Sequence, residues 1–143
     1  MGFLAGKRVL ITGLISNRSI AYGIAKACHR EGADLAFTYQ NDRVRDRIAK
    51  FADEFGSKAI YACDVAEDAQ IDALFADLGK HWEGLDGLVH SIAFAPTEAI
   101  EGDFLEGISR ESFRIAHDVS SYSYPALAKG ARVCVVTSGG KML

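Results

Sequence analysis

The chain has 143 residues, of which 49% are hydrophobic and 24% charged, and its formal net charge is −3. This is the composition of one ordinary globular domain, over residues 1–143, and without a basic excess it argues against a nucleic-acid partner. No apolar run approaches the roughly 20 residues that span a bilayer, and the N-terminus lacks a signal-peptide pattern, which predicts a cytoplasmic protein with no membrane contact. The three cysteines are widely spaced without a Cys-x-x-Cys pattern, which indicates reduced thiols and no metal site.

Short apolar runs of strand length alternate with longer segments of helical period. The runs predict strands near residues 9–11, 33–39, 59–63, 85–90 and 132–137. The segments between them predict helices near residues 19–32, 41–56, 71–79 and 109–129, the last interrupted by Pro125, and an irregular loop over residues 91–107. Strands joined by single helices pair in parallel with right-handed crossovers. The expected fold is therefore α/β, a Rossmann-like doubly wound parallel sheet of about five strands in the order 3-2-1-4-5.

The segment after the first predicted strand has features of a phosphate-binding loop. In this topology ligands bind beyond the carboxyl ends of the strands, at the switch point between strands 1 and 4. Gly13 permits a tight turn and a close approach of phosphate, and Ser19 at the helix start offers a hydroxyl and an N–H group. The strict Gly-x-Gly-x-x-Gly spacing is absent, so this segment alone is a weak indication.

The ends of the second and third predicted strands carry polar residues suited to a dinucleotide. Gln40 stands where a ribose-binding carboxylate is usual, and it can bind a ribose hydroxyl without repelling a 2′-phosphate. Arg43 and Arg45 leave NADPH open, although two arginines there equally fit a solvated helix face. Asp64 can accept from the exocyclic amine of adenine while Val65 packs on the ring, or Asp64 can cap the following helix.

An unusually apolar loop, residues 90–96, follows the fourth predicted strand. Such a loop suits the wall of a site for a flat ring or an apolar substrate, and it equally suits burial under the next helix. Each strand end alone has an ordinary structural explanation. Four ligand-suited strand ends at one edge of a sheet are harder to dismiss, and together they indicate a nucleotide site.

Five motifs together closely resemble the bacterial NADH-dependent enoyl-acyl-carrier-protein reductases, a divergent branch of the short-chain dehydrogenase/reductase superfamily. They are residues 13–23 (Gly-x5-Ser-Ile-Ala-x-Gly), 37–40, 63–65, 90–95 and 115–123. The resemblance implies that Gly13, Ser19 and Ile20 hold the pyrophosphate side of NADH and that Gln40 lies at its adenosine end. It also implies that Asp64 and Val65 hold the adenine, that Ile92 packs near the cofactor and that Ala95 touches the acyl substrate. NADH is expected rather than NADPH.

The resemblance implies the last reductive step of fatty-acid elongation, with an enoyl substrate carried by acyl carrier protein and a subunit that self-associates. Hydride would pass from NADH to a trans-2-enoyl thioester, and the family's catalytic Tyr-x6-Lys segment follows the fifth strand. In this chain the motifs fade after Lys129, residues 131–143 diverge, and the catalytic residues stay unassigned. Tyr122 and Lys129 have the same spacing, but they lie on the helix before that strand. Two alternatives remain: a catalytically inactive NAD-binding or self-associating form, and another short-chain reductase.

Overall fold

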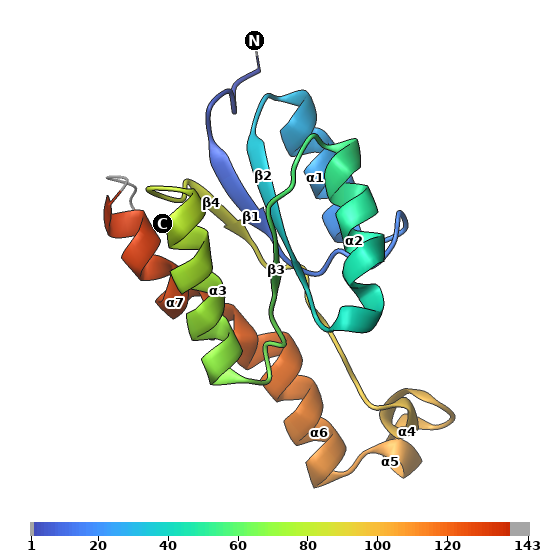
Figure 1. Cartoon of the computed structure of the whole chain (residues 1–143). Coiled ribbons are helices and arrows are strands. Elements are labelled where there is room, and N and C mark those ends of the chain that lie inside the picture. The colour runs from blue at the N-terminus through green and yellow to red at the C-terminus, as the bar shows by residue number, and fades with distance from the viewer. Residues whose placement is uncertain (1, 138–143) are drawn as a thin grey trace.

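The computed structural model describes residues 2–137. Its sheet has four parallel strands in the order β3-β2-β1-β4 (Figure 1). They are β1 (Arg8–Ile11), β2 (Asp34–Tyr39), β3 (Ile60–Ala62) and β4 (Gly87–Val89). Val9 stands opposite Leu35 on one side and Gly87 on the other. The doubly wound topology and the predicted order of these four strands are confirmed.

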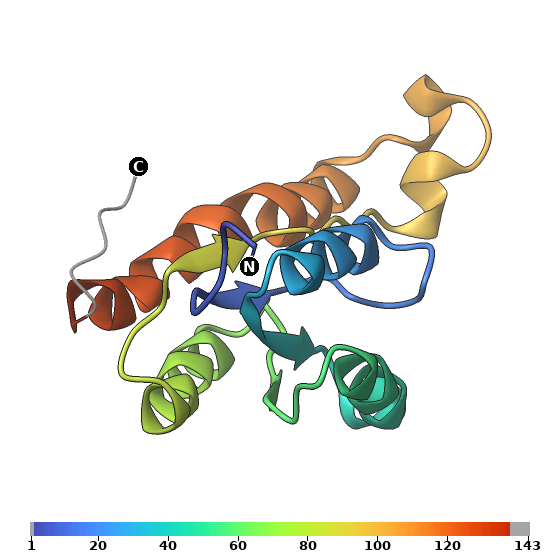
Figure 2. The same cartoon turned by 90° about the horizontal axis from the view of Figure 1, so that it is seen from above.

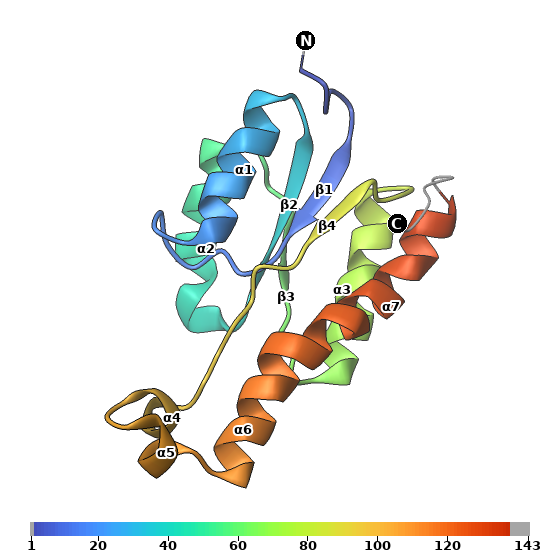
Figure 3. The same ribbon diagram turned by 180° about the vertical axis from the view of Figure 1, so that it is seen from behind.

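Different pairs of helices cover the two faces of the sheet. Helices α1 (Ile20–Arg30) and α2 (Asp42–Glu54) lie on one face, and α3 (Asp68–His81) and α7 (Ser123–Thr137) lie on the other (Figures 1 and 3). Successive residues of a strand point to opposite faces. Val9 and Ile11 accordingly pack with α1 and α2, whereas Leu10 packs with α3 and α7. The two central strands, β1 and β2, are thus buried on both faces, which explains why they are mostly apolar runs.

The expected loop over residues 91–107 contains two short helices. They are α4 (Thr97–Ile100) and α5 (Phe104–Gly107), and from above the segment that carries them extends away from the sheet (Figure 2). Asp103 caps α5 by accepting hydrogen bonds from the backbone of Leu105 and Glu106. Within the described residues, no helix is both long enough and apolar enough to cross a membrane.

The expected break at Pro125 takes the form of a π-helical turn. Helix α6 (Arg110–His117) continues into the turn η1 (Asp118–Tyr122) and then into α7. Proline lacks an N–H group, and its ring collides with the carbonyl four residues earlier in a regular α-helix. The wider π turn ends at Tyr122, three residues before the proline. It lets the chain pass the proline while remaining helical.

The fifth strand predicted over residues 132–137 is wrong, because these residues continue α7. Leu127, Ala131 and Cys134 recur at helical spacing and are buried against α3. The two helices approach so closely at Gly130 that an added Cβ would lie 2.5 Å from the Phe75 ring. Packing against α3 stabilises this segment as a helix. That stabilisation outweighs the preference of its valine-rich sequence for a strand. Residues 138–143, where the sequence motifs of the family were expected to have faded, lie outside the described residues.

Candidate nucleotide site at the strand ends

A cavity of about 370 Å³ lies beyond the carboxyl ends of the strands. It has two walls besides the segment 13–15 that follows β1. The β2–β3 wall consists of Thr38, Gln40, Val44 and residues 63–66, and the β4 wall consists of residues 91–94 and Val119. A volume of this size is in the range of small-molecule sites. The cavity stands at the switch point that the sequence indicated, between β1 and β4.

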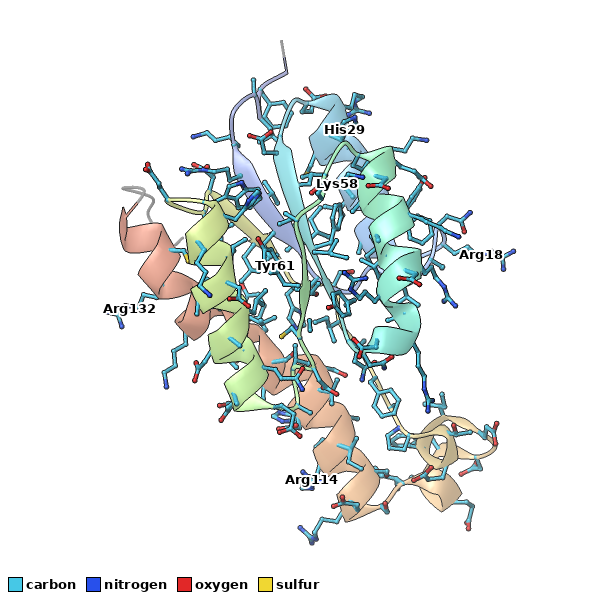
Figure 4. The ribbon with its side chains drawn as sticks, in the orientation of Figure 1. Arg18, His29, Lys58, Tyr61, Arg114 and Arg132 are labelled. Carbon is cyan, nitrogen blue, oxygen red and sulfur yellow. The ribbon has the colours of Figure 1, made fainter. Side chains whose placement is uncertain are left out.

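Five of the eight predicted site residues line this one cavity: Gly13, Gln40, Asp64, Val65 and Ile92. The other three do not line it. Ser19 precedes the first residue of α1, Ile20 is 77% exposed, and Ala95 is half-buried one residue beyond the β4 wall. Arg18, in the loop between β1 and α1, is exposed and extends outward from the molecule (Figure 4).

Gly13 allows the end of β1 to touch the loop that follows β4. Its φ is +85°, a backbone conformation that residues with a side chain rarely adopt. A Cβ at this position would lie 1.8 Å from the carbonyl oxygen of Ser91. The absence of a side chain is therefore required both by the turn and by contact with the β4 wall. The same feature leaves the backbone open to close approach by a ligand.

At the start of α1, the hydrogen-bonding groups of Ser19 are used within the loop. Its backbone N–H and its hydroxyl both donate to the carbonyl of Ser16, over 3.1 and 2.5 Å. The N–H groups of Ile20 and Ala21 have no hydrogen-bond partner in the described part of the chain. These are the donors that a helix N-terminus can present to a phosphate. The resemblance gave the pyrophosphate side to Gly13, Ser19 and Ile20. In the structure the N–H and hydroxyl of Ser19 are used within the loop, and the backbone N–H groups of Ile20 and Ala21 are the ones left available.

Asp64 is held in place by its own turn. Its Oδ1 accepts from the Ala66 N–H over 3.0 Å, and its N–H donates to the Gln70 side chain over 2.8 Å. Gln40 donates to Asp64 Oδ2 over 3.4 Å, so the predicted adenosine-side residues are adjacent. Glu67 and not Asp64 occupies the N-cap position of α3, although the Glu67 side chain makes no capping hydrogen bond. The hydrogen bond from Ala66 N–H to Asp64 Oδ1 forms an Asx turn, and Asp64 lines the cavity.

The remaining lining of the β2–β3 wall is uncharged and, apart from Thr38, apolar. Val65 is buried, and burial together with the nearby Asp64 carboxylate raises the pKa of the Cys63 thiol to about 11. Cys63 therefore stays protonated at neutral pH and behaves as a small apolar side chain. Arg43 and Arg45 are exposed on α2 and do not line the cavity.

The β4 wall is attached to the π turn by side chains that the sequence did not single out. Ser120 Oγ hydrogen-bonds both the N–H and the carbonyl of Phe94, and Ser123 Oγ lies 2.7 Å from His90 Nε2. Burial lowers the pKa of His90, which favours its neutral form. Serines near a proline carry no signal of this role, because which serine faces the loop depends on the helical register. Ile92 packs on the core while Phe94 is 53% exposed, so the loop is only partly buried.

Two further cavities do not lie at the carboxyl ends of the strands. One, of about 410 Å³ between α3 and α7, is lined by both Tyr122 and Lys129. This pair is therefore not part of the nucleotide cavity, as its position in the sequence suggested. The other, of about 500 Å³, includes His29 and Lys58 at the opposite edge of the sheet (Figure 4). Within the described residues, no group of three or more His, Cys, Asp or Glu is placed to hold a metal ion.

Comparison with known proteins decides the family. The family model described as enoyl-(acyl carrier protein) reductase matches residues 13–143. The chain belongs to this family. The match continues past Lys129, where the sequence motifs were expected to end.

Among relatives of this reductase family, the NADH-dependent enoyl-[acyl-carrier-protein] reductase FabI of Neisseria meningitidis is 64% identical over 132 residues, covering 92% of the chain and 51% of the relative. FabI of Escherichia coli is 59% identical, covering 92% and 50%. The crystal structure of the enoyl-[acyl-carrier-protein] reductase (NADH) from Aquifex aeolicus superposes with a TM-score of 0.90 at 48% identity, over 93% of this chain and 52% of that one. The chain spans about half the length of the curated relatives it matches.

Proposed function

We propose that this chain carries the NADH-binding part of an enoyl-acyl-carrier-protein reductase of fatty-acid biosynthesis. The observation that carries the proposal is the cavity at the switch point, where five predicted residues from separate strand ends meet. The Neisseria and Escherichia relatives are named as NADH-dependent enzymes, which supports the same assignment. The substrate would be a trans-2-enoyl thioester carried by acyl carrier protein.

The residues of the cavity fit the parts of a dinucleotide. The carboxylate of Asp64 is oriented by its turn and can accept from an adenine amine, and buried Val65 offers an apolar surface for the ring. Gly13 leaves its backbone bare beside the loop end, where a phosphate can approach. Ile92 supplies an apolar contact further along the cavity, and Ala95 beyond it would meet the acyl chain. Bound NADH would supply the hydride for the reduction.

NADH is favoured over NADPH at the adenosine end. Gln40 is neutral and stands beside Asp64, whose carboxylate would repel a 2′-phosphate. Arg43 and Arg45, the cations that could offset this repulsion, do not line the cavity. We therefore expect NADH to bind at least about tenfold more tightly than NADPH, which corresponds to about 1.4 kcal/mol.

We assign binding, and not turnover, to the described residues. Tyr122 and Lys129 line a different cavity, and no other tyrosine–lysine pair of the family spacing was identified in the sequence. A non-catalytic NAD-binding form is therefore the second candidate, and it rests on this same separation. We further propose that the chain is cytoplasmic. We also propose that it self-associates, and the exposed apolar side chains of Phe104, Leu105 and Phe113 support this.

Calorimetric titration of the purified chain with NADH and with NADPH tests the binding proposal. The expected result is one site with NADH preferred, and no detectable NADH binding would overturn it. A second assay adds a crotonyl thioester and follows NADH absorbance. Oxidation above a buffer control would show turnover, whereas binding without oxidation would favour the non-catalytic form.

A further inference from the structure

One hydroxyl group binds both backbone groups of a single residue in the β4 wall. Ser120 Oγ accepts the N–H of Phe94 over 2.9 Å and donates to the carbonyl of Phe94 over 3.0 Å. The two residues are 26 positions apart in the sequence. A side chain that satisfies a donor and an acceptor of one loop residue restricts that residue far more than a single hydrogen bond does.

A second serine on the same helical segment holds the end of β4. The hydroxyl of Ser123 donates to the carbonyl of Val119 over 2.6 Å. Ser123 Oγ also lies 2.7 Å from His90 Nε2, a hydrogen bond whose donor depends on the tautomer of the imidazole. Ser123 therefore anchors the residue that begins the loop.

The π turn is what brings these groups together. The N–H of Ser123 donates to the carbonyl of Asp118, five residues earlier, as in a π-helix. Within this turn Val119 lines the cavity, while the next residue, Ser120, reaches the loop. Neighbouring residues of one turn thus contact the ligand space and the wall that bounds it. Single π turns are frequent at functional sites.

Two contacts, at Ser91 and at Phe94, consequently flank Ile92 and Ala93 in the β4 wall. At one point the carbonyl of Ser91 lies against the bare backbone of Gly13. At the other point Phe94 is held by Ser120. Ile92 and Ala93 lie between them and line the cavity. Releasing either point would free the segment that faces the ligand.

We propose that Ser120 is a positioning residue of the nucleotide site, which acts by holding Phe94 and so fixes the β4 wall. Its hydroxyl is occupied by the loop, and Ser120 does not line the cavity. The identity of the ligand, NADH, rests on the proposed function. The attachment of the loop does not, because it can be measured without a ligand.

The chain offers a matched control on the same turn. Ser121 is exposed, and its hydroxyl has no hydrogen bond in the described part of the chain. Ser121→Ala removes the same atom from the adjacent position without touching the loop. Ser120→Thr keeps the hydroxyl, and Ser120→Cys removes strong hydrogen bonding at nearly constant size, which gives a second removal variant.

The first measurement is amide hydrogen exchange at Phe94, followed by NMR in the protein without ligand. Ser120→Ala and Ser120→Cys are expected to raise the exchange rate of this amide by about tenfold or more, because its acceptor, Ser120 Oγ, is lost. Ser121→Ala and Ser120→Thr should leave it slow, and slow exchange in β1 verifies that each variant is folded. Unchanged exchange at Phe94 in both removal variants, or equal loss in Ser121→Ala, would overturn the proposal.

The second measurement is the NADH dissociation constant of the same variants. We expect it to rise roughly tenfold in Ser120→Ala and to stay unchanged in Ser121→Ala, with recovery in Ser120→Thr. Equal affinities in the two alanine variants would overturn the positioning role even if exchange at Phe94 had increased. If the unmodified chain binds no NADH, the proposed function fails. The exchange result still decides whether Ser120 holds the loop.

Discussion

The two walls of the nucleotide cavity are held by hydrogen bonds of very different range. In the β2–β3 wall, Asp64 is oriented by Ala66 and Gln70, both within six residues along the chain. In the β4 wall, Phe94 is held by Ser120, 26 residues away, and only because a π turn brings that side chain to the loop. The turn at Asp64 in the first wall depends mainly on local chemistry, with one longer contact from Gln40, 24 residues away. The attachment of Phe94 in the second wall depends on how α3, α7 and the sheet pack together. Damage to global packing should therefore affect the two walls unequally.

The largest effect is expected at the point where the end of β1 touches the β4 wall. Gly13→Ala would place a Cβ 1.8 Å from the Ser91 carbonyl in a left-handed backbone conformation. We expect a loss of roughly 3 kcal/mol or more in the free energy of unfolding, measured by urea denaturation. Gly56→Ala is the control, because Gly56 has a φ of +68° with no atom near its Cβ position. It should cost about 1 kcal/mol, and equal losses in the two variants would contradict the contact.

The next effect tests the helix that carries the π turn. Gly130→Ala would place a Cβ 2.5 Å from the Phe75 ring, so we expect a loss of about 1–3 kcal/mol in the free energy of unfolding. Gly79→Ala is the control, because Gly79 lies in α3 with open space around it. That substitution should stabilise the chain slightly, since alanine favours helix. A stabilising Gly130→Ala would mean that α7 does not pack on α3 in this way.

A smaller effect is expected from the β2–β3 wall, and it should appear in binding rather than in stability. Asp64→Asn removes the charge that we propose accepts a hydrogen bond from adenine, while keeping the size of the side chain. We expect NADH affinity to fall about tenfold in calorimetric titrations, with the unfolding transition nearly unchanged. Asp72→Asn is the control, because Asp72 is an exposed residue of α3 that lines the separate cavity between α3 and α7. Equal affinities of the two variants would remove Asp64 from the site.

The smallest effect concerns pH and the β4 wall. The pKa of His90 is lowered by burial, so the folded chain binds a proton at His90 less readily than the unfolded chain does. The stability that comes from neutral His90 is fully present above the pKa of this residue in the unfolded chain, about 6.5. It is lost as the pH falls toward the lower pKa of His90 in the folded chain. Urea denaturation between pH 7.5 and 5 should therefore show a steeper loss in the unmodified chain than in His90→Asn. Parallel pH profiles would contradict the assignment of a neutral His90.

The features that the sequence could predict are the ones set by local contacts, and the features it could not predict depend on long-range packing. Strand order and the residues at the ends of β1, β2 and β3 follow from local patterns: apolar runs, a glycine that turns the chain, and an acid in a tight turn. The fifth strand was predicted from the local preference of Val133, Val135 and Val136, and the packing of Ala131 and Cys134 on α3 overrides that preference. Ser120 was missed because its role depends on a hydrogen bond across 26 residues and on the register that the π turn sets. Local preference cannot encode either of these.

The most direct test of the central claim is an NADH titration followed by NMR of the backbone amides. The account predicts that the signals of Gly13, Asp64 and Ile92 shift together with one dissociation constant, because all three line the same cavity. Asp72 and Tyr122, at the cavity between α3 and α7, should not move. Shifts confined to that second cavity, or no shifts with NADH at any concentration, would contradict a nucleotide site at the strand ends.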